Sequence, residues 1–99
     1  MKRKYDKQHK DWAKAVKDRD NNKCIICGAT TICCSHHLIP WEDERFRLDT
    51  NNGITLCSKH HSRYGKQISP HNDYAGLFFL WLNLNKPEIW RWFCENVEL

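Results

Sequence analysis

The stretch that decides the fold lies between residues 23 and 61, and its three motifs read KCIICG (23–28), CCSHHLIPW (33–41) and NNGITLCSKHH (51–61). The first motif holds a C-x-x-C pair, Cys24 and Cys27, and the third holds a C-x-x-H pair, Cys57 and His60. Two such pairs supply the four sulfur and nitrogen ligands that a closed, tetrahedral zinc site requires. The spacing therefore predicts a structural Zn²⁺ bound by Cys24, Cys27, Cys57 and His60.

A second group of polar residues in the same stretch is not used by the zinc pairs, and it consists of His36, His37, Asn52 and His61. A neutral imidazole accepts a proton from water near neutral pH, and imidazole nitrogens also bind divalent metal ions. On an extended segment, neighbouring side chains point in opposite directions, so one of His36 and His37 can bind metal while the other faces a water molecule. This pattern favours a hydrolytic metal site.

The order and offsets of these motifs resemble those of HNH endonucleases with a zinc-bound ββα-metal (His-Me finger) core. The matching features are the His-His pair before Leu-Ile-Pro, Asn52 five residues ahead of Cys57, and His61 just after the second zinc pair. The run N-N-G-I-T-L-C-x-x-x-H is most similar to small phage-encoded HNH proteins. The resemblance covers about residues 12–64 and implies an α+β fold with a ββα-metal core and a Cys3His knuckle pair. The residue pattern adds a flanking N-terminal helix and two C-terminal helices.

The resemblance also implies the roles of the four residues. His37 would be the general base, and His36 and His61 would bind a catalytic divalent metal ion, Mn²⁺ or Mg²⁺. Asn52 would hold the loop and orient His37 through hydrogen bonds, as a supporting residue does in many metal sites.

Two positions differ from the usual family pattern. His60 stands where most relatives have a fourth cysteine, and its roles could be exchanged with those of the adjacent His61. Many phage relatives carry a further His four residues after the last motif His, but this chain has Gly65 there. We therefore expect no third imidazole at the catalytic metal, and we expect His9 and His71 to be ordinary exposed residues.

Charge is distributed unevenly along the 99 residues. Residues 1–23 contain nine Lys or Arg and four Asp, whereas residues 24–99 contain seven Lys or Arg and eight Asp or Glu, which together give the net charge of +4. A basic arm beside a metal site suits a polyanion, and DNA is the first candidate. The predicted DNA contacts are Lys2, Arg3, Lys4 and Arg63. A solvated helix face without a partner is the alternative, and Arg19 is expected to pair with a helix carboxylate rather than with phosphate.

Composition also limits the class of protein. No apolar stretch follows Met1 that would indicate a signal peptide, and no run approaches the roughly 20 apolar residues of a membrane span. The cysteine spacings favour metal binding over disulfides, and thus a reducing cytoplasm, which would be the host cytoplasm for a phage-encoded protein.

The chain is expected to form a single domain, residues 1–99. It would comprise a basic arm (1–9), a zinc-bound core (10–66) with a helix near 10–20 and strands near 30–35 and 54–56, and a helical extension (67–99). In the extension, Asp73 is expected to cap a helix over 74–82, and Pro87 is expected to open a helix that continues to about Val97. The apolar residues of this extension are either core or a docking surface for a partner or a second copy, which leaves monomer and dimer both open.

Two functions remain. The first is a metal-dependent endonuclease that hydrolyses DNA phosphodiester bonds by nicking or double-strand cleavage with low sequence specificity. The resemblance implies a phage-encoded protein linked to genome packaging, although homing and restriction enzymes share the same core. The second is a non-catalytic zinc-stabilised module that binds nucleic acid, which gives no reason for His37 and Asn52. A zinc deaminase is excluded because its H-x-E and P-C-x-x-C pattern is absent.

Overall fold

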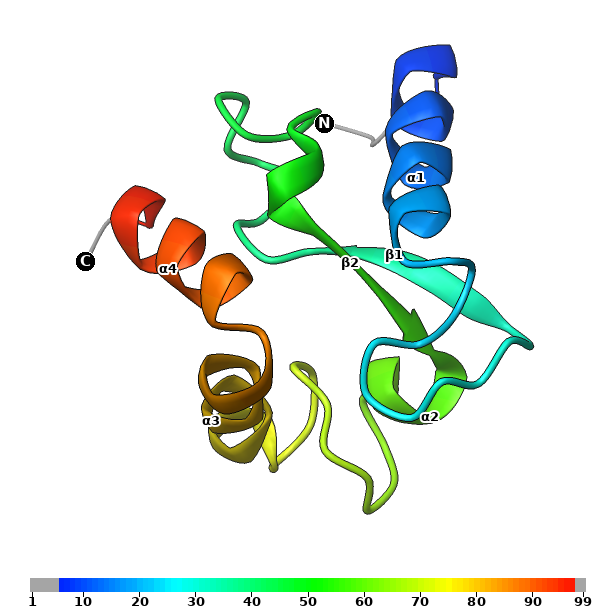
Figure 1. Ribbon diagram of the computed structural model, residues 1–99, viewed down its shortest axis with the longest axis vertical. Coiled ribbons are helices and arrows are strands. Elements are labelled where there is room, and N and C mark those ends of the chain that lie inside the picture. The colour runs from blue at the N-terminus through cyan, green and yellow to red at the C-terminus, as the bar shows by residue number, and fades with distance from the viewer. Residues whose placement is uncertain (1–5, 98–99) are drawn as a thin grey trace.

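Two short antiparallel strands form the centre of the fold in this computed structural model, which describes residues 6–97. The elements in chain order are α1 (Lys7–Arg19), β1 (Cys33–His37), the 3-10 turn η1 (Thr50–Asn52), β2 (Gly53–Cys57), α2 (Ser58–His61), α3 (Ala75–Asn85) and α4 (Pro87–Asn96) (Figure 1). Figure 1 shows α1 on one side of the hairpin and the pair α3 and α4 on the other. The predicted α+β fold is confirmed, with β1, β2 and α2 forming the ββα core.

Strand pairing places the two motifs opposite each other. Cys33 lies across from Cys57, and His37 lies across from Gly53. The first strand begins three residues later than predicted, because Ile32 takes a left-handed φ of 51° that interrupts extended backbone. The shift carries the His-His pair into β1. The neighbouring thiols of Cys33 and Cys34 donate to backbone carbonyl oxygens.

Helix α1 packs directly on the hairpin through one face. Asp6 caps it by accepting a hydrogen bond from the His9 amide, so the helix begins at Lys7, within the segment predicted to be an arm. Trp12 and Val16, one turn apart, are buried and confirm the expected stripe. A Cβ at Gly53 would collide with the Val16 side chain and lie 2.7 Å from Cζ2 of Trp12, so only glycine permits this close approach.

The C-terminal helices divide the apolar residues between core and surface. Phe78 and Leu82 are fully buried and join Ile54 and Leu56 in the core, whereas the α3 side chains of Leu77, Leu80 and Leu84 are exposed. Pro87 opens α4 as predicted. The predicted Asp73 cap is wrong, because α3 begins after Tyr74 and no side chain caps it. Among residues 6–97, no helix has the length and apolar character of a membrane span.

Candidate active site and zinc knuckle

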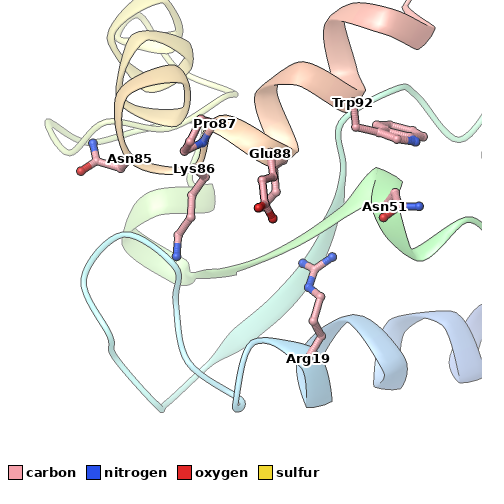
Figure 2. A pocket seen from close by; sticks show the side chains of 8 residues that line it. Arg19, Asn51, Asn85, Lys86, Pro87, Glu88 and Trp92 are labelled. Carbon is pink, nitrogen blue, oxygen red and sulfur yellow. The ribbon is translucent and has the colours of Figure 1, made fainter.

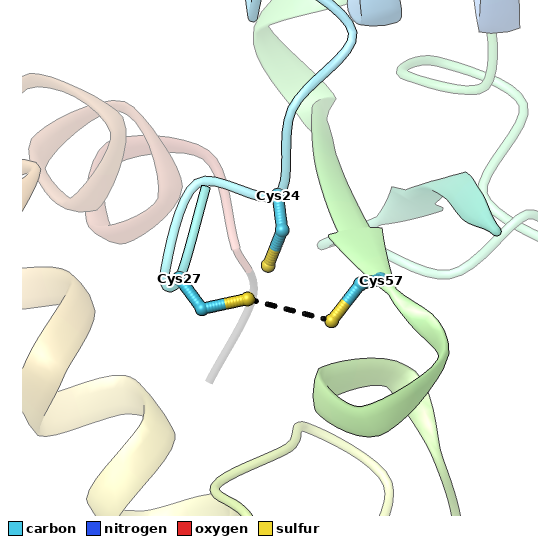
Figure 3. A group of neighbouring side chains, drawn as sticks. All are labelled: Cys24, Cys27 and Cys57. Atoms are coloured by element: carbon cyan, nitrogen blue, oxygen red, sulfur yellow. Dashed lines mark hydrogen bonds between the residues drawn. The ribbon is translucent and has the colours of Figure 1, made fainter. Parts of the chain in front are cut away.

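Three cysteines converge at the end of β2, where Cys57 lies opposite Cys33. The Sγ atoms of Cys24, Cys27 and Cys57 lie within 4.8 Å of one another, and those of Cys27 and Cys57 are 3.6 Å apart (Figure 3). Sulfurs bound at about 2.3 Å around a tetrahedral zinc lie about 3.8 Å apart. The cysteine geometry therefore fits a zinc ion.

Backbone hydrogen bonds fix the knuckle that presents two of these sulfurs. Gly28 has a φ of 76° and donates to the Cys24 carbonyl at 2.9 Å, while the Ile25 amide donates to Thr55 of β2 at 3.0 Å. Burial of Cys57 opposes its ionisation. Hydrogen bonds from backbone amides of α2 and from neighbouring thiols outweigh that effect and lower the pKa of Cys57, which favours the thiolate that metal requires.

His60 is buried on α2 beside the knuckle, but its ring nitrogens fall outside the group formed by the three sulfurs. Its Nδ1 lies 2.8 Å from the Ile68 carbonyl oxygen, and because a carbonyl only accepts, Nδ1 carries the proton. The Nε2 lone pair is thus available to metal. Such a backbone contact on the second ring nitrogen is usual for metal-binding histidines, so a fourth ligand from His60 stays a prediction.

Five histidines border one cavity of about 520 Å³ beside the hairpin, namely His9, His36, His37, His61 and His71. His36 and His37 come from β1, and His61 comes from the last residue of α2. The structure therefore brings together the three histidines expected from the sequence, at the junction of strand and helix.

His37 is held on two sides. Its Nε2 lies 2.8 Å from the Arg47 carbonyl oxygen, so Nε2 carries the proton and Nδ1 carries the basic lone pair. The Trp12 indole stacks on its face at 3.8 Å between ring centroids. Its tautomer and its ring plane are both determined by neighbours.

Asn52 supports this arrangement from a distance. It is fully buried, its Oδ1 accepts from the Ile39 amide at 2.6 Å, and its Nδ2 donates to the carbonyls of Ile39 and Phe46. These three hydrogen bonds all go to the loop, and none of them goes to His37 itself. Asn52 instead closes the loop over residues 39–46, and the next residue, Arg47, supplies the carbonyl that orients His37.

His71 was expected to be an ordinary residue, and the structure corrects this. Ligand nitrogens of His36, His61 and His71 lie within 4.8 Å of one another, and Nε2 of His61 is 3.1 Å from Nε2 of His71. Gly65 stands where many phage relatives carry a further histidine, but the loop after α2 brings the imidazole of His71 beside those of His36 and His61. The sequence signal is weak, because His71 is marked only by turn-forming Pro70 and Asn72 beside it.

The pKa values of all three imidazoles are lowered, which favours their neutral form. Burial, followed by the nearby rings of His71 and His61, lowers the pKa of His36 to about 3. Burial and then His71 lower the pKa of His61, and burial and then Arg63 lower the pKa of His71. Neutral imidazoles are the form that binds metal.

His9 also departs from expectation. It is buried with only 8% of its surface exposed, and its ring lies 4.7 Å from that of Trp41 and 5.7 Å from that of His37. Its ring lies 5.6 Å from that of Trp12, and His9 itself borders the cavity.

The predicted DNA contacts fall in two places. Arg63 is exposed and borders the histidine cavity, whereas Lys2, Arg3 and Lys4 lie outside the described residues. Arg19 pairs with the Asp20 carboxylate at 2.8 Å, as expected, and also donates to the carbonyls of Thr50 and Gly53.

A second hollow, of about 440 Å³, lies between the end of α1, η1 and the start of α4 (Figure 2). Arg19, Glu88 and Trp92 border it, and none of the predicted catalytic or metal-binding residues does.

Comparison with known proteins agrees with this geometry. Residues 24–68, which carry both ligand groups except His71, match a family model described as HNH endonuclease. The chain belongs to the HNH endonuclease family. It is also 33% identical over 60 residues to "Anaredoxin" from Nostoc sp. (strain PCC 7120), an alignment that covers 60% of this chain and 78% of that relative. No solved structure matches the chain with significance.

Proposed function

We propose that this HNH-family protein is a metal-dependent endonuclease that hydrolyses DNA phosphodiester bonds by nicking or double-strand cleavage with little sequence specificity. The observation that carries the proposal is the cavity shared by His36, His37 and His61, because it places the proposed base beside two imidazoles that could hold a metal ion. A binding module has no use for this combination.

His37 is proposed as the general base. Its Nε2–H is engaged by the Arg47 carbonyl, so Nδ1 is the nitrogen that accepts the proton of the attacking water. The water oxygen then bonds to phosphorus as the bond to the 3′-oxygen breaks. Positioned bases of this kind contribute typically 10²–10⁴-fold to rate.

His36 and His61 are proposed to hold the divalent ion, Mn²⁺ or Mg²⁺. When bound, such an ion would neutralise charge on the phosphate and on the departing oxygen. The lowered pKa values of both imidazoles support this proposal, because the neutral form of imidazole is the one that binds metal. Imidazole ligands suit Mn²⁺ better than Mg²⁺, which prefers oxygen, so faster cleavage with Mn²⁺ is part of the proposal.

Zinc is proposed to have a structural role only. Cys24, Cys27 and Cys57, with His60 as fourth ligand, would fix the knuckle to the end of β2 at Cys57. Closed sites with four protein ligands leave no open position for substrate.

DNA is proposed to approach the cavity along Arg63, which is exposed beside it, with Lys2, Arg3 and Lys4 as further phosphate contacts. A role in phage genome packaging belongs to the same proposal and rests on the resemblance to small phage-encoded HNH proteins.

The test is incubation of zinc-loaded protein with supercoiled plasmid and Mn²⁺ or Mg²⁺. We expect nicked or linear product, its loss on addition of EDTA, and a fall of at least about 100-fold in rate for His37→Ala. DNA binding and zinc content should remain at the parental level in that variant. Plasmid that stays intact with every metal, despite tight DNA binding, would identify the protein as a binding module.

A further inference from the structure

His71 lies beside His36 and His61, the two proposed metal ligands, although it belongs to none of the motifs that predicted a metal site. Its ring centroid is 4.7 Å from that of His36 and 4.6 Å from that of His61, with the ring planes nearly perpendicular in both pairs. Three imidazoles thus meet edge to face around one point, and within the described residues 6–97 no carboxylate belongs to this group.

The distance between nitrogens is that expected of ligands to one ion. Nitrogens bound at about 2.0–2.1 Å to one metal ion lie about 2.9–3.4 Å apart in octahedral or tetrahedral geometry. The Nε2 atoms of His61 and His71 are 3.1 Å apart.

The loop after α2 holds His71 in place from both sides. Before it, Ser69 is fully buried and its hydroxyl accepts from the His71 amide at 3.1 Å. After it, Asn72 donates to the Gln67 carbonyl at 2.7 Å and accepts from the Tyr74 amide. Ile68 of the same loop accepts from His60 on α2. The imidazole is exposed and accessible, but its backbone is fixed.

We propose that His71 is the third protein ligand of the catalytic divalent metal, in place of the helical histidine that Gly65 excludes. This inference rests on the proposed metal site at His36 and His61. It also implies that the metal ion links the ββα core to the C-terminal extension, because His71 lies on the segment that leads into α3.

Metal binding by the zinc-loaded full-length chain tests the proposal without DNA. Mn²⁺ and Co²⁺ would be titrated calorimetrically, and Co²⁺ would also be followed by its visible absorption. We expect one ion per chain beyond the structural zinc. His71→Ala should weaken its affinity at least roughly tenfold, since even loss of a supporting partner costs 10–100-fold, and it should change the Co²⁺ spectrum.

Two further variants complete the test. Asp73→Ala changes an exposed residue on the same loop and should bind as the parent does. His71→Asp retains a ligand atom and should restore binding with a shift of preference towards Mg²⁺. The proposal is overturned if His71→Ala binds the metal with parental affinity. It is also overturned if Asp73→Ala loses as much metal affinity as His71→Ala, or if the parent binds no second metal ion. If the parent binds the metal in a His71-dependent way but does not cut plasmid, only the proposed nuclease function is overturned.

Discussion

The rings of Trp12 and His37 are parallel to within 3°, although the two residues come from α1 and β1. Trp12 is itself fixed, because it is buried and its indole N–H donates to the Asp49 carbonyl at 2.8 Å. The helix that precedes the family motif therefore sets the plane of the proposed general base, while the Arg47 carbonyl sets its tautomer.

We expect Trp12→Leu to reduce the cleavage rate at 25 °C by about tenfold or more, because His37 would lose the face that holds its ring. Trp12→Phe should recover most of the rate, since it keeps an aromatic face. Val16→Ala on the same helix is the control, because Val16 is fully buried and its truncation costs stability without touching His37. Thermal unfolding and plasmid cleavage should be measured together. Equal cleavage rates in Trp12→Leu and Val16→Ala would show that Trp12 contributes only to core packing and does not orient His37.

Replacement of Asn52 should affect both stability and cleavage. In Asn52→Asp, a carboxylate oxygen would face the carbonyls of Ile39 and Phe46 in place of the amide donor, so we expect a loss of about 2 kcal/mol or more in unfolding free energy. Loosening of this loop should also slow cleavage. Asn51→Asp introduces the same charge at an exposed neighbour and should change little. Full activity in Asn52→Asp would show that the loop does not orient His37.

Cys27→Ser should release zinc and unfold or aggregate the chain, because binding of a structural zinc is coupled to folding. Cys94→Ser provides the matched control, since Cys94 is exposed on α4 and outside the cysteine group. Elemental analysis of chelator-washed protein should give about one zinc per chain for the parent and for Cys94→Ser. A folded Cys27→Ser protein without zinc would disprove a structural role for the metal.

Metal affinity at the histidine cavity should decline only modestly between pH 7.5 and pH 6.0. Protonation competes with metal, so affinity falls as pH falls, and three imidazoles with the ordinary pKa of 6.5 would together lose about 50-fold over this range. The pKa of His36 is about 3, so it stays neutral, and the pKa values of His61 and His71 are also lowered. We expect a loss below about 15-fold by Mn²⁺ calorimetry. A loss near 50-fold would indicate exposed, ordinary imidazoles.

The basic arm should contribute to DNA affinity through phosphate contacts. Replacement of Lys2, Arg3 and Lys4 by Ala should lower the slope of log affinity against log salt by up to about 2.7, and Arg63→Ala by up to about 0.9. Lys86→Ala removes a charge beside the other hollow and should leave the slope unchanged. An unaltered slope in the triple variant would mean that the arm does not touch DNA.

The sequence was sufficient to identify candidate ligands that lie close together in the chain, within one motif or in motifs on neighbouring elements. Cys24, Cys27 and Cys57 were expected together, and they are together, because a C-x-x-C turn and a strand end present sulfurs in few ways. His36 and His37 on β1 and His61 on α2 likewise border one cavity, because α2 directly follows the strand that pairs with β1.

The same reasoning failed where a long connection decides the position. His71 is ten residues beyond His61, and no periodicity predicts that an irregular loop returns to the site. His9 was expected to be an ordinary exposed residue of the basic arm, but it is buried and its ring lies 4.7 Å from that of Trp41, which comes from a distant segment. Asn52 was expected to hold the loop and orient His37, but its partners, Ile39 and Phe46, could not be predicted, because hydrogen-bond partners within a loop are set by its folded path.

The sulfur contact between Cys27 and Cys57 joins positions thirty residues apart. With zinc bound there, the segment containing His36, His37 and Asn52 becomes a closed loop, and its closure would remove ~3–4 kcal/mol of entropy from the unfolded chain if a metal cross-link acts as a disulfide does. A protease cut at the exposed residues Glu44 and Arg45 would therefore leave two fragments still joined through the metal. A cut after His61 would instead separate His71 from His36 and His61. Zinc therefore holds together the part of the chain that carries the proposed base, whereas His71 depends on an uninterrupted backbone.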